Sequence, residues 1–451
     1  MQAGNLTSSS LRLQPDERER RVRAKTRQSA ARYEPAQTSL AGGVSSSLRR
    51  ASRPYPLYFS HGEGARIVDA DDNSYLDYTL AWGPLILGHA APEVTRALQR
   101  QAGLGLTFGA QHDLEFEVAE KLVSIIPCAD AVCFANSGTE IVQLALRLSR
   151  SATRRTKFLK FEGHYHGWAD NVLCSYHPSA EEITTGGGGA PIPVGTGQRP
   201  QTDTLVAQWN AAGEVEALFA RHGGEIAAVI CEPLQCNSGC VPADPGFLEF
   251  LREMTGRHGT VLIFDEVITG FRLDLAGAQG RYGVTPDLAV YAKAIGAGAT
   301  LSAMAGRREL MGLIASGTVV HAGTLNGNPL ALAAGKACLE VLARDGGSVY
   351  GHLRRRSERL RSGLEELLRT HLGPVVTQGD GAVFQVQFME RAARNYRETL
   401  AADRKLYSDF ALALLDEGVL VLPDGRWYVS IAHTDADIEA TLTAAARAVV
   451  A

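Results

Sequence analysis

The stretch Val261–Ala297 reads VLIFDEVITGFRLDLAGAQGRYGVTPDLAVYAKAIGA. It begins with an apolar run that is typical of a buried parallel strand, and this run ends in two acids, Asp265 and Glu266. A second apolar run, Leu288–Ala292, ends in Lys293. Because open α/β sheets bind ligands at the carboxyl ends of their strands, we expect Asp265 and Lys293 to face one crevice.

An acid and a lysine in that arrangement suit pyridoxal 5'-phosphate. A lysine amine forms a Schiff base with the aldehyde of this cofactor, and a carboxylate keeps the pyridine nitrogen protonated. Taken alone, Asp265 is equally compatible with a helix N-cap and Lys293 with a solvated lysine. However, FDEVITGFR followed by AKAIGAG closely resembles the signature of class III (fold type I) aminotransferases. We therefore take Lys293 and Asp265 as the candidate catalytic residues, with Lys293 as the general base.

The composition is that of an ordinary enzyme, with 451 residues, 45% hydrophobic content and a formal net charge of −4. This length favours two domains. The sequence has no large block of like charges, which argues against nucleic-acid and membrane partners and leaves small molecules as the expected partners. It contains neither an apolar run of membrane length nor a signal peptide pattern, so we expect a cytoplasmic enzyme.

The seven cysteines do not form a metal-binding pattern. Cys231, Cys236 and Cys240 lie close together in the sequence, but no CxxC pair or matched pair of histidines accompanies them. We expect reduced thiols and no metal.

The resemblance implies an α/β fold of type I. Such a fold has a large domain, with a mainly parallel seven-stranded sheet between helices, and a smaller α+β domain. We expect a flexible polar N-terminal extension over residues 1–37, an N-terminal arm and part of the small domain over 38–91, the large cofactor-binding domain over 92–328, and the C-terminal small domain over 329–451. Within the extension, residues 1–15 are expected to be disordered and Asp16–Tyr33 to form an exposed charged helix.

A candidate phosphate site follows the apolar strand Ala131–Ala135. A turn with Ser137, Gly138 and Thr139 leads from this strand into the helical run Ile141–Leu148. Such a turn directs free backbone N–H groups and the helix dipole toward an anion. By itself a Ser-Gly-Thr turn is usually only a cap, but the resemblance implies that these residues hold the cofactor phosphate.

The resemblance implies further contacts with the cofactor ring. The sequence Tyr165-His166-Gly167 matches a motif whose tyrosine stacks on the pyridine ring, and we count His166 among the residues of the cofactor pocket without assigning acid–base work to it. Val267 lies on the same side of its strand as Asp265 and would press on the opposite face of the ring.

An amide side chain near residue 236 is expected to contact the phenolate oxygen of the cofactor. The sequence Glu232–Asn237 reads EPLQCN, and Cys236 stands where the family usually has glycine. This departure leaves open whether Gln235 or Asn237 makes the contact, and we favour Asn237.

The resemblance also predicts a homodimer. His321–Pro329 is similar to the G-T-x-x-G-N-P motif, whose threonine reaches the phosphate of the neighbouring subunit's cofactor. Thr324 is the matching residue, and this implies active sites shared between two subunits.

Two N-terminal stretches narrow the resemblance to the glutamate-1-semialdehyde aminomutase-like subfamily. These are GGVSSSLR, which ends in Arg49, and DYTLAWGPLILGHAAPEV, which contains Trp82. The subfamily implies that Arg49 binds the substrate carboxylate and that Trp82 lines the pocket. A guanidinium suits this role because it donates two parallel hydrogen bonds, although Arg49 beside Arg50 also fits an ordinary surface arginine.

The segment Leu422–Ser430 departs from the aminomutase pattern. Aminomutases carry a P-S-x-F-E segment here, whereas this chain has the shorter LPDGRWYVS with Arg426 in the acid's place. A base in place of an acid changes which substrate ends are accepted, so we take Arg426 as a substrate residue and favour transfer between two molecules. The alternatives are glutamate-1-semialdehyde 2,1-aminomutase and an aminotransferase acting on an amino-sugar aldehyde. A catalytically silent scaffold is disfavoured because Lys293 and Asp265 are intact.

Residues 179–204 are rich in Gly, Pro and Thr and predict a long loop. The loop follows the Tyr165 motif, where the aminomutase relatives carry a mobile loop. This position favours a lid over the site.

Overall fold

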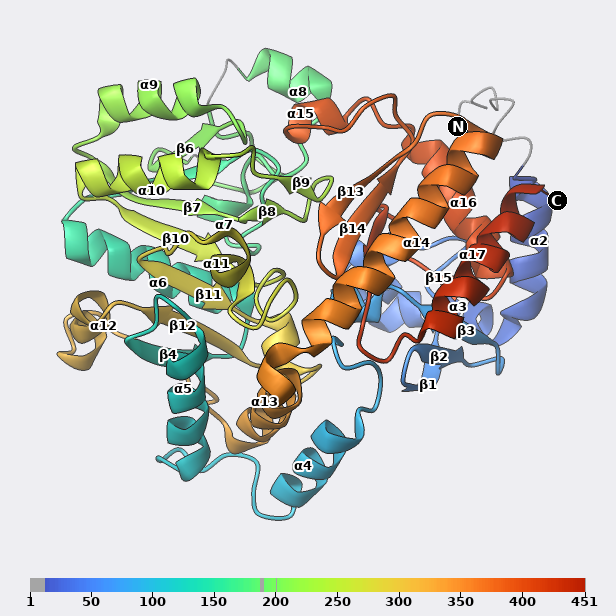
Figure 1. Cartoon of the computed structure of the whole chain (residues 1–451), viewed down its shortest axis with the longest axis horizontal. Coiled ribbons are helices and arrows are strands. Elements are labelled where there is room, and N and C mark those ends of the chain that lie inside the picture. The colour runs from blue at the N-terminus through green and yellow to red at the C-terminus, as the bar shows by residue number, and fades with distance from the viewer. Residues whose placement is uncertain (1–12, 187–189, 200, 451) are drawn as a thin grey trace.

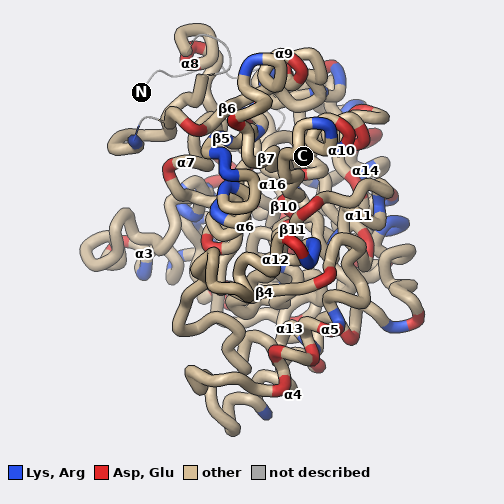
Figure 2. The backbone as a smooth tube through the Cα atoms, turned by 90° about the vertical axis from the view of Figure 1, so that its left-hand side faces the viewer, with Lys and Arg blue, Asp and Glu red and all other residues tan. Residues whose placement is uncertain are grey.

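The computed structural model describes residues 13–186, 190–199 and 201–450, and Figure 1 shows the whole chain. Most of the N-terminal stretch for which disorder is expected therefore lies outside the described residues. Lys and Arg alternate with Asp and Glu over the face seen in Figure 2. Among the described residues, no helix is long and apolar enough to cross a membrane.

A seven-stranded sheet forms the larger part of the molecule, in the strand order β4-β12-β11-β10-β7-β5-β6. Only β12 runs antiparallel to its two neighbours, so the expected mainly parallel seven-stranded sheet is confirmed. The strands are β4 (Ala131–Ala135), β5 (Lys157–Phe161), β6 (Thr204–Ala207), β7 (Ile226–Cys231), β10 (Val261–Asp265), β11 (Leu288–Tyr291) and β12 (Ser302–Gly306).

Strand β7 is apolar along its whole length, and β10 is apolar up to its last residue, Asp265, as expected for strands with both faces covered. Every residue of β7 and β10 is buried. In β10, Val261 and Ile263 pack into the core that α6 (Gly138–Thr153) covers, whereas Leu262 and Phe264 pack into the core beneath α10 (Phe247–His258). Successive side chains of the strand point to opposite faces of the sheet, and both faces are apolar, as expected for a parallel sheet between helices.

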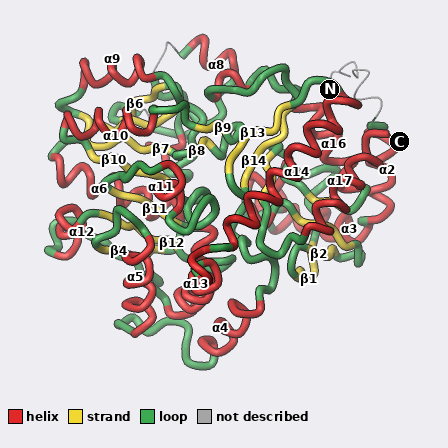
Figure 3. Tube along the Cα trace, in the orientation of Figure 1, coloured by secondary structure: helices red, strands yellow, loops and turns green. Residues whose placement is uncertain are grey.

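The remaining helices of the larger part surround this sheet (Figure 3). They are α4 (Pro92–Ala102), α5 (Asp113–Ile125), α7 (Asp170–Leu173), α8 (Ala180–Thr185), α9 (Ala212–His222), α11 (Gly277–Tyr282), α12 (Arg308–Ala315) and α13 (Pro329–Leu342). Helix α13, which the expected ranges assign to the small domain, packs against α4 and α5. The predicted loop over 179–204 is not entirely irregular, because α8 forms within it and is capped by Ser179 and Glu182.

The smaller part combines both ends of the chain. One sheet has the order β1-β2-β3-β15 and another the order β13-β14-β16. The elements are β1 (Phe59–Glu63), β2 (Arg66–Asp69), β3 (Ser74–Asp77), β13 (Val376–Asp380), β14 (Val383–Gln387), β15 (Val419–Leu420), β16 (Arg426–Tyr428), α14 (Val349–Leu372), α15 (Tyr396–Thr399), α16 (Arg404–Asp416) and α17 (Asp435–Val450). The parallel pairing of β3 with β15 joins the N-terminal arm to the C-terminal region.

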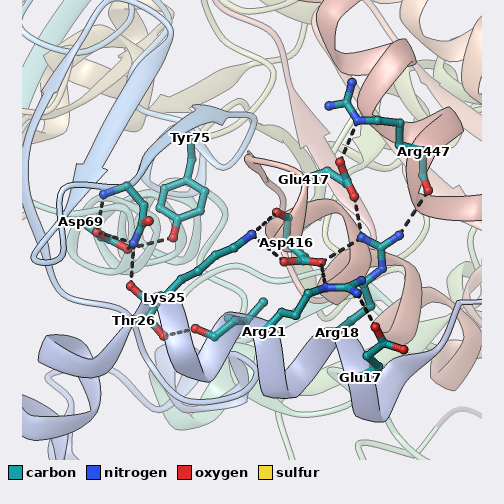
Figure 4. Close-up of polar contacts among 12 residues, drawn as sticks. Glu17, Arg18, Arg21, Lys25, Thr26, Asp69, Tyr75, Asp416, Glu417 and Arg447 are labelled. Carbon is teal, nitrogen blue, oxygen red and sulfur yellow. Dashed lines mark hydrogen bonds and ion pairs between the residues drawn. The ribbon is translucent and has the colours of Figure 1, made fainter. Parts of the chain in front are cut away.

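One side of the first described helix of the N-terminal extension is docked, whereas most residues of the extension are exposed, as the sequence predicts. The described part of the extension forms α2 (Pro15–Lys25) and α3 (Arg27–Ser39), and α2 packs against α16 near the C-terminus (Figure 1). The guanidinium of Arg18 is buried and donates to Asp416, at 2.9 Å, and to Glu417. Arg21 and Lys25 donate to the same Asp416 (Figure 4). The burial of Arg18 could not be predicted from the sequence. A charged helix that is paired with distant carboxylates has the same composition as a charged helix in solvent.

We expect Asp416→Asn to destabilise the apoprotein at pH 7 by about 3 kcal/mol, because it leaves Arg18 buried with one carboxylate fewer. Burial opposes ionisation of Asp416, but hydrogen bonds from Lys25, Arg18 and Arg21 outweigh it and hold its pKa below the usual range. The stabilisation is therefore full above the unfolded-state pKa of about 3.9 and is lost as the pH falls through the lower folded-state pKa. The change in the free energy of unfolding is measured by urea unfolding.

Glu253→Gln, which breaks an exposed pair with Arg257, is the control and should cost less than about 1 kcal/mol. Equal losses of stability in the two variants would contradict the docking role of Asp416.

Candidate active site

The carboxyl ends of β5, β7, β10 and β11 border one cavity of about 220 Å³. Among the residues expected to bind the cofactor, all except Ser137 and Thr324 line it: Gly138, Thr139, Tyr165, His166, Asn237, Asp265, Val267 and Lys293. The structure therefore gathers in one place residues that are up to 155 positions apart (293 − 138). Their individual roles remain predictions.

Asp265 and Lys293 reach the cavity from neighbouring parallel strands. Asp265 is paired with Val290 across β10 and β11, and Lys293 follows shortly after β11 ends. Lys293 has a φ of 50°, in the left-handed region that side chains other than glycine rarely adopt. Such strain costs of order 1–3 kcal/mol and occurs most often at functional sites.

The amine of Lys293 is poised for proton transfer. Burial, and to a smaller extent the nearby guanidinium of Arg426, lowers the pKa of Lys293 to about 8. A lysine with such a pKa is partly neutral near pH 8, and only the neutral amine acts as a nucleophile or a base.

The carboxylate of Asp265 is 4% exposed, and burial raises its pKa to about 7. Its Oδ2 accepts from Nδ1 of His166 at 2.7 Å, and its Oδ1 accepts from the backbone N–H of Val267 at 3.1 Å. Burial also lowers the pKa of His166 far below its usual value, so this partner is neutral. Among the described residues no arginine or lysine forms an ion pair with Asp265. The charge of Lys293 lowers the pKa of Asp265, but by less than burial raises it.

The N-terminus of α6 offers donors at another point of the cavity. Ser137 caps the helix and exchanges hydrogen bonds with Glu140, which satisfies the backbone N–H groups of both residues. Within the described parts of the chain, the N–H groups of Gly138 and Thr139 have no acceptor, and both residues line the cavity. Free N–H groups at a helix N-terminus are suited to a phosphate.

Asn237 rather than Gln235 lines the cavity. The side chain of Gln235 is buried and donates to the carbonyl of Glu162 at 3.3 Å. Asn237 Oδ1 accepts from Nη1 of Arg426 at 2.8 Å. This arrangement supports the preference for Asn237, and its contact with the cofactor remains a prediction.

The expected substrate residues Arg49, Trp82 and Arg426 are not among the residues that line the cofactor cavity. Arg49 and Trp82 line a second cavity of about 520 Å³, and the Arg49 guanidinium forms no hydrogen bond or ion pair with the described residues. Arg426 is buried, with its guanidinium 5.8 Å from the ring centre of Trp82. Trp82 and Asn237 also line a third cavity, of about 370 Å³. Trp82 thus lies between Arg49 and the cofactor cavity.

Thr324 lies apart from this cavity and is exposed. Its segment approaches the phosphate turn, because Nδ2 of Asn136 donates to Oδ1 of Asn326 at 3.0 Å. An exposed position is compatible with a residue that acts on a partner subunit, so the role of Thr324 remains a prediction.

Two charged residues of the site were missed in the sequence. Glu232 follows β7 and lines the cavity, and Lys160 lies within β5 and is fully buried. Both stand in or directly after an apolar run, which is the same signal that marked Asp265. We draw on both residues below.

Comparisons with known proteins agree with this site. The family model for aminotransferase class-III matches residues 47–449. The chain is 42% identical to glutamate-1-semialdehyde 2,1-aminomutase 2 of Brevibacillus brevis over 92% of this chain and 96% of that protein. It is 43% identical to the glutamate-1-semialdehyde 2,1-aminomutase of Desulforudis audaxviator over 93% and 97%.

Solved structures give the same picture. An omega-transaminase from Sphaerobacter thermophilus superposes with a TM-score of 0.89 at 33% identity and covers 93% of this chain and 97% of its own. A glutamate-1-semialdehyde-aminomutase from Pseudomonas aeruginosa, in complex with PMP, gives a TM-score of 0.88 at 27% identity, with 97% and 98% covered.

The cavity fits the cofactor of these relatives, since it has a lysine with a lowered pKa and, among the residues that the structure describes, a buried acid that no arginine or lysine pairs with and unpaired N–H groups at a helix N-terminus. Pyridoxal 5'-phosphate is accordingly the cofactor. The chain belongs to the class III aminotransferase family and is a pyridoxal-phosphate-dependent enzyme of fold type I.

Proposed function

We propose that this enzyme moves an amino group within one small molecule, as a glutamate-1-semialdehyde 2,1-aminomutase does. The observation that carries the proposal is 42–43% identity to curated aminomutases over more than nine-tenths of both chains. This is the alternative in the sequence-based interpretation, and these relatives favour it over the preferred transfer between two molecules.

Each charged or polar group of the cavity would act on a different part of the cofactor or substrate. When bound, pyridoxal phosphate supplies an aldehyde that takes up an amine and a ring that accepts electrons. Asp265 keeps a negative charge at one end of the cavity, which favours a protonated ring nitrogen, and His166 orients this carboxylate. Gly138 and Thr139 present N–H groups to the phosphate at the other end. Lys293 takes a proton from the substrate carbon and returns it at the neighbouring position.

Arg49 and Trp82 would hold the rest of the substrate. Arg49 donates to the substrate carboxylate with its planar fork, and its exposed guanidinium has no partner in the described chain to compete with it. The ring of Trp82 excludes water from one side of the pocket.

A second candidate function is amino transfer between two molecules, and Arg426 favours it. This side chain lies where aminomutases carry an acid, and it donates to Asn237 and to Asp424 beside the cofactor cavity. The omega-transaminase and the beta-phenylalanine aminotransferase with solved structures are 33% and 31% identical to this chain. The guanidinium of Arg426 is buried and paired with Asp424 at 2.9 Å, so it would act on an acceptor through the positions of Asn237 and Asp424 rather than as a free cation.

We also propose a homodimer. Seven large apolar side chains of the larger part are exposed, and a single enzyme chain rarely leaves a large apolar surface uncovered. They are Leu104, Leu106, Phe108, Phe116, Trp168, Val320 and Leu325. The last two flank Thr324, so a second copy of the chain that covers this surface would meet Thr324.

Lys293→Ala should still fold but should not hold the cofactor covalently, because no amine remains at this position. The purified wild-type protein is expected to be yellow, and borohydride should fix the cofactor to Lys293, as peptide mass spectrometry would show. Lys336→Ala, which removes a surface lysine paired with Glu117, is the control and should behave as wild type. Fixation at any other lysine would refute the assignment of Lys293.

Conversion of glutamate 1-semialdehyde to 5-aminolevulinate without any added amino acceptor decides between the two candidate functions. The proposed aminomutase should carry out many turnovers under these conditions, since the amino group stays within one molecule. Product formation is followed by mass spectrometry over time. Turnover that requires a separate carbonyl acceptor, with release of a stoichiometric carbonyl product, would instead establish the transferase.

Thr324→Ala should weaken cofactor binding by about 1.5 to 3 kcal/mol, the range for a hydrogen bond to a charged group, while the dimer persists. Cofactor titration of the apoprotein and light scattering measure the two properties. Thr318→Ala, at another exposed threonine of the same segment, is the control. Unchanged affinity in Thr324→Ala would place this threonine outside the phosphate site.

A further inference from the structure

We propose that Glu232 is a positioning residue that ties together the two turns carrying Tyr165 and Asn237, and that Lys160 fixes one of these turns from behind. We call Glu232, Lys160 and the intervening His164 the carboxylate clamp. The inference rests on the roles proposed for Tyr165 and Asn237 at the cofactor. In this proposal the clamp sets the distance between two side chains. They are the Tyr165 ring, which stacks on the cofactor, and the Asn237 amide, which contacts the edge of the cofactor.

The carboxylate of Glu232 joins two turns that follow different strands. It is 3% exposed, and its Oε1 accepts from the backbone N–H of Tyr165 at 2.7 Å. Its Oε2 accepts from the backbone N–H of Asn237 at 3.2 Å. Since both contacts are to backbone, they fix the course of the chain at two residues that line the cofactor cavity.

His164 adds a third connection between the turns. The backbone N–H of Glu232 donates to Nδ1 of His164 at 3.0 Å. Two contacts with Glu232 therefore hold the Tyr165 turn. The N–H of Tyr165 donates to the Glu232 side chain, and the ring of the preceding residue, His164, accepts from the Glu232 backbone.

Lys160 holds the back of the Tyr165 turn. Its buried Nζ donates to the carbonyls of His164 at 3.1 Å, Val172 at 2.8 Å and Cys174 at 2.6 Å. An ammonium has three donors, and all three are used on the segment between β5 and the start of residues 179–204, with one acceptor in the short helix α7 and two outside it. His164 and Cys174 lie outside helices and strands, so their carbonyls accept from Lys160 rather than from a regular backbone ladder.

The burial of these charges is costly, which argues for a purpose beyond packing. Burial raises the pKa of Glu232 to about 7 and lowers the pKa of Lys160 to about 8. An apolar residue would fill either position without this cost, but it would leave two N–H groups or three carbonyls without partners. Glu232 uses both carboxylate oxygens on backbone N–H groups, which is the pattern of a residue that positions others.

The first test replaces Glu232 by Gln, which keeps the shape but has only one acceptor oxygen for two N–H groups. In the apoprotein, amide hydrogen exchange in peptides containing Tyr165 and Asn237 should become at least tenfold faster. Pyridoxal phosphate, titrated by protein fluorescence, should bind about tenfold more weakly, and the absorbance maximum of the bound cofactor should shift.

A matched control separates the clamp from a general loss of stability. Asp69 is fully buried, and its Oδ1 accepts from the backbone N–H groups of Asp71 and Asn73, both at 2.9 Å, in a hairpin of the smaller part. Asp69→Asn therefore makes the same chemical change away from the cofactor. It should accelerate exchange only in its own hairpin and leave cofactor affinity and the absorbance maximum unchanged.

The second test compares two lysines of the same strand. Lys160→Met should accelerate exchange over residues 162–175 and weaken cofactor binding, whereas Lys157→Met, which removes an outward lysine paired with Glu225, should do neither. If Lys160→Met or Glu232→Gln fails to fold, wild-type exchange still tests the clamp. The amides of Tyr165 and Asn237 must then be protected in the apoprotein, and unprotected amides would overturn the proposal.

Failure of the clamp is distinguishable from failure of the proposed function. Unchanged exchange and affinity in a folded Glu232→Gln protein would overturn the clamp, whatever reaction the wild type catalyses. Conversely, a wild type that does not convert glutamate 1-semialdehyde would overturn the aminomutase while leaving the exchange and affinity results intact.

Discussion

Ionisable side chains buried at the carboxyl ends of apolar strands are the constraint on which the rest of this site depends. Asp265 ends β10 and Glu232 follows β7, and burial raises the pKa of each to about 7. A buried carboxylate needs donors, so each one dictates where its neighbours stand. Asp265 takes an N–H from His166 and one from Val267, whereas Glu232 takes those of Tyr165 and Asn237. All four residues that donate to these two carboxylates, Tyr165, His166, Asn237 and Val267, also line the cavity.

Without a ligand, the cavity contains both a carboxylate and hydrogen-bond donors that have no partner of opposite charge among the described residues. Within the described chain, Asp265 forms no ion pair with an arginine or lysine, and the N–H groups of Gly138 and Thr139 have no acceptor. Nε2 of His166 is also buried without a partner. A ligand with a protonated nitrogen at one end and a phosphate at the other supplies both missing charges, and this is the chemistry of pyridoxal phosphate. The physical basis of cofactor selection is thus visible in what the side chains leave unpaired.

The substrate side depends on contacts between distant parts of the chain. Arg272 is fully buried, and its guanidinium donates to the carbonyls of Gly83, Ala382 and Val429, which belong to the N-terminal arm and the C-terminal region. The cation also lies 4.8 Å from the ring centre of Tyr428, two residues after Arg426. Trp82 precedes Gly83, so one guanidinium of the larger part sets the positions of both Trp82 and Arg426.

The sequence by itself determined the parts that depend on local pattern. Apolar runs predicted β4, β10 and β11 to within about a residue, and the charge at the end of such a run marked Asp265 and Lys293. Strand β12, whose Ser302–Gly306 is rich in small residues, gave no such signal and is the antiparallel member of the sheet. Only the tertiary structure decided that Arg18 is buried against Asp416, 398 residues away, and that Arg426 meets Asn237, 189 residues away. The reason is physical: a run of apolar residues specifies a strand locally, whereas the partner of a buried charge depends on which strands lie side by side and which ends of the chain meet.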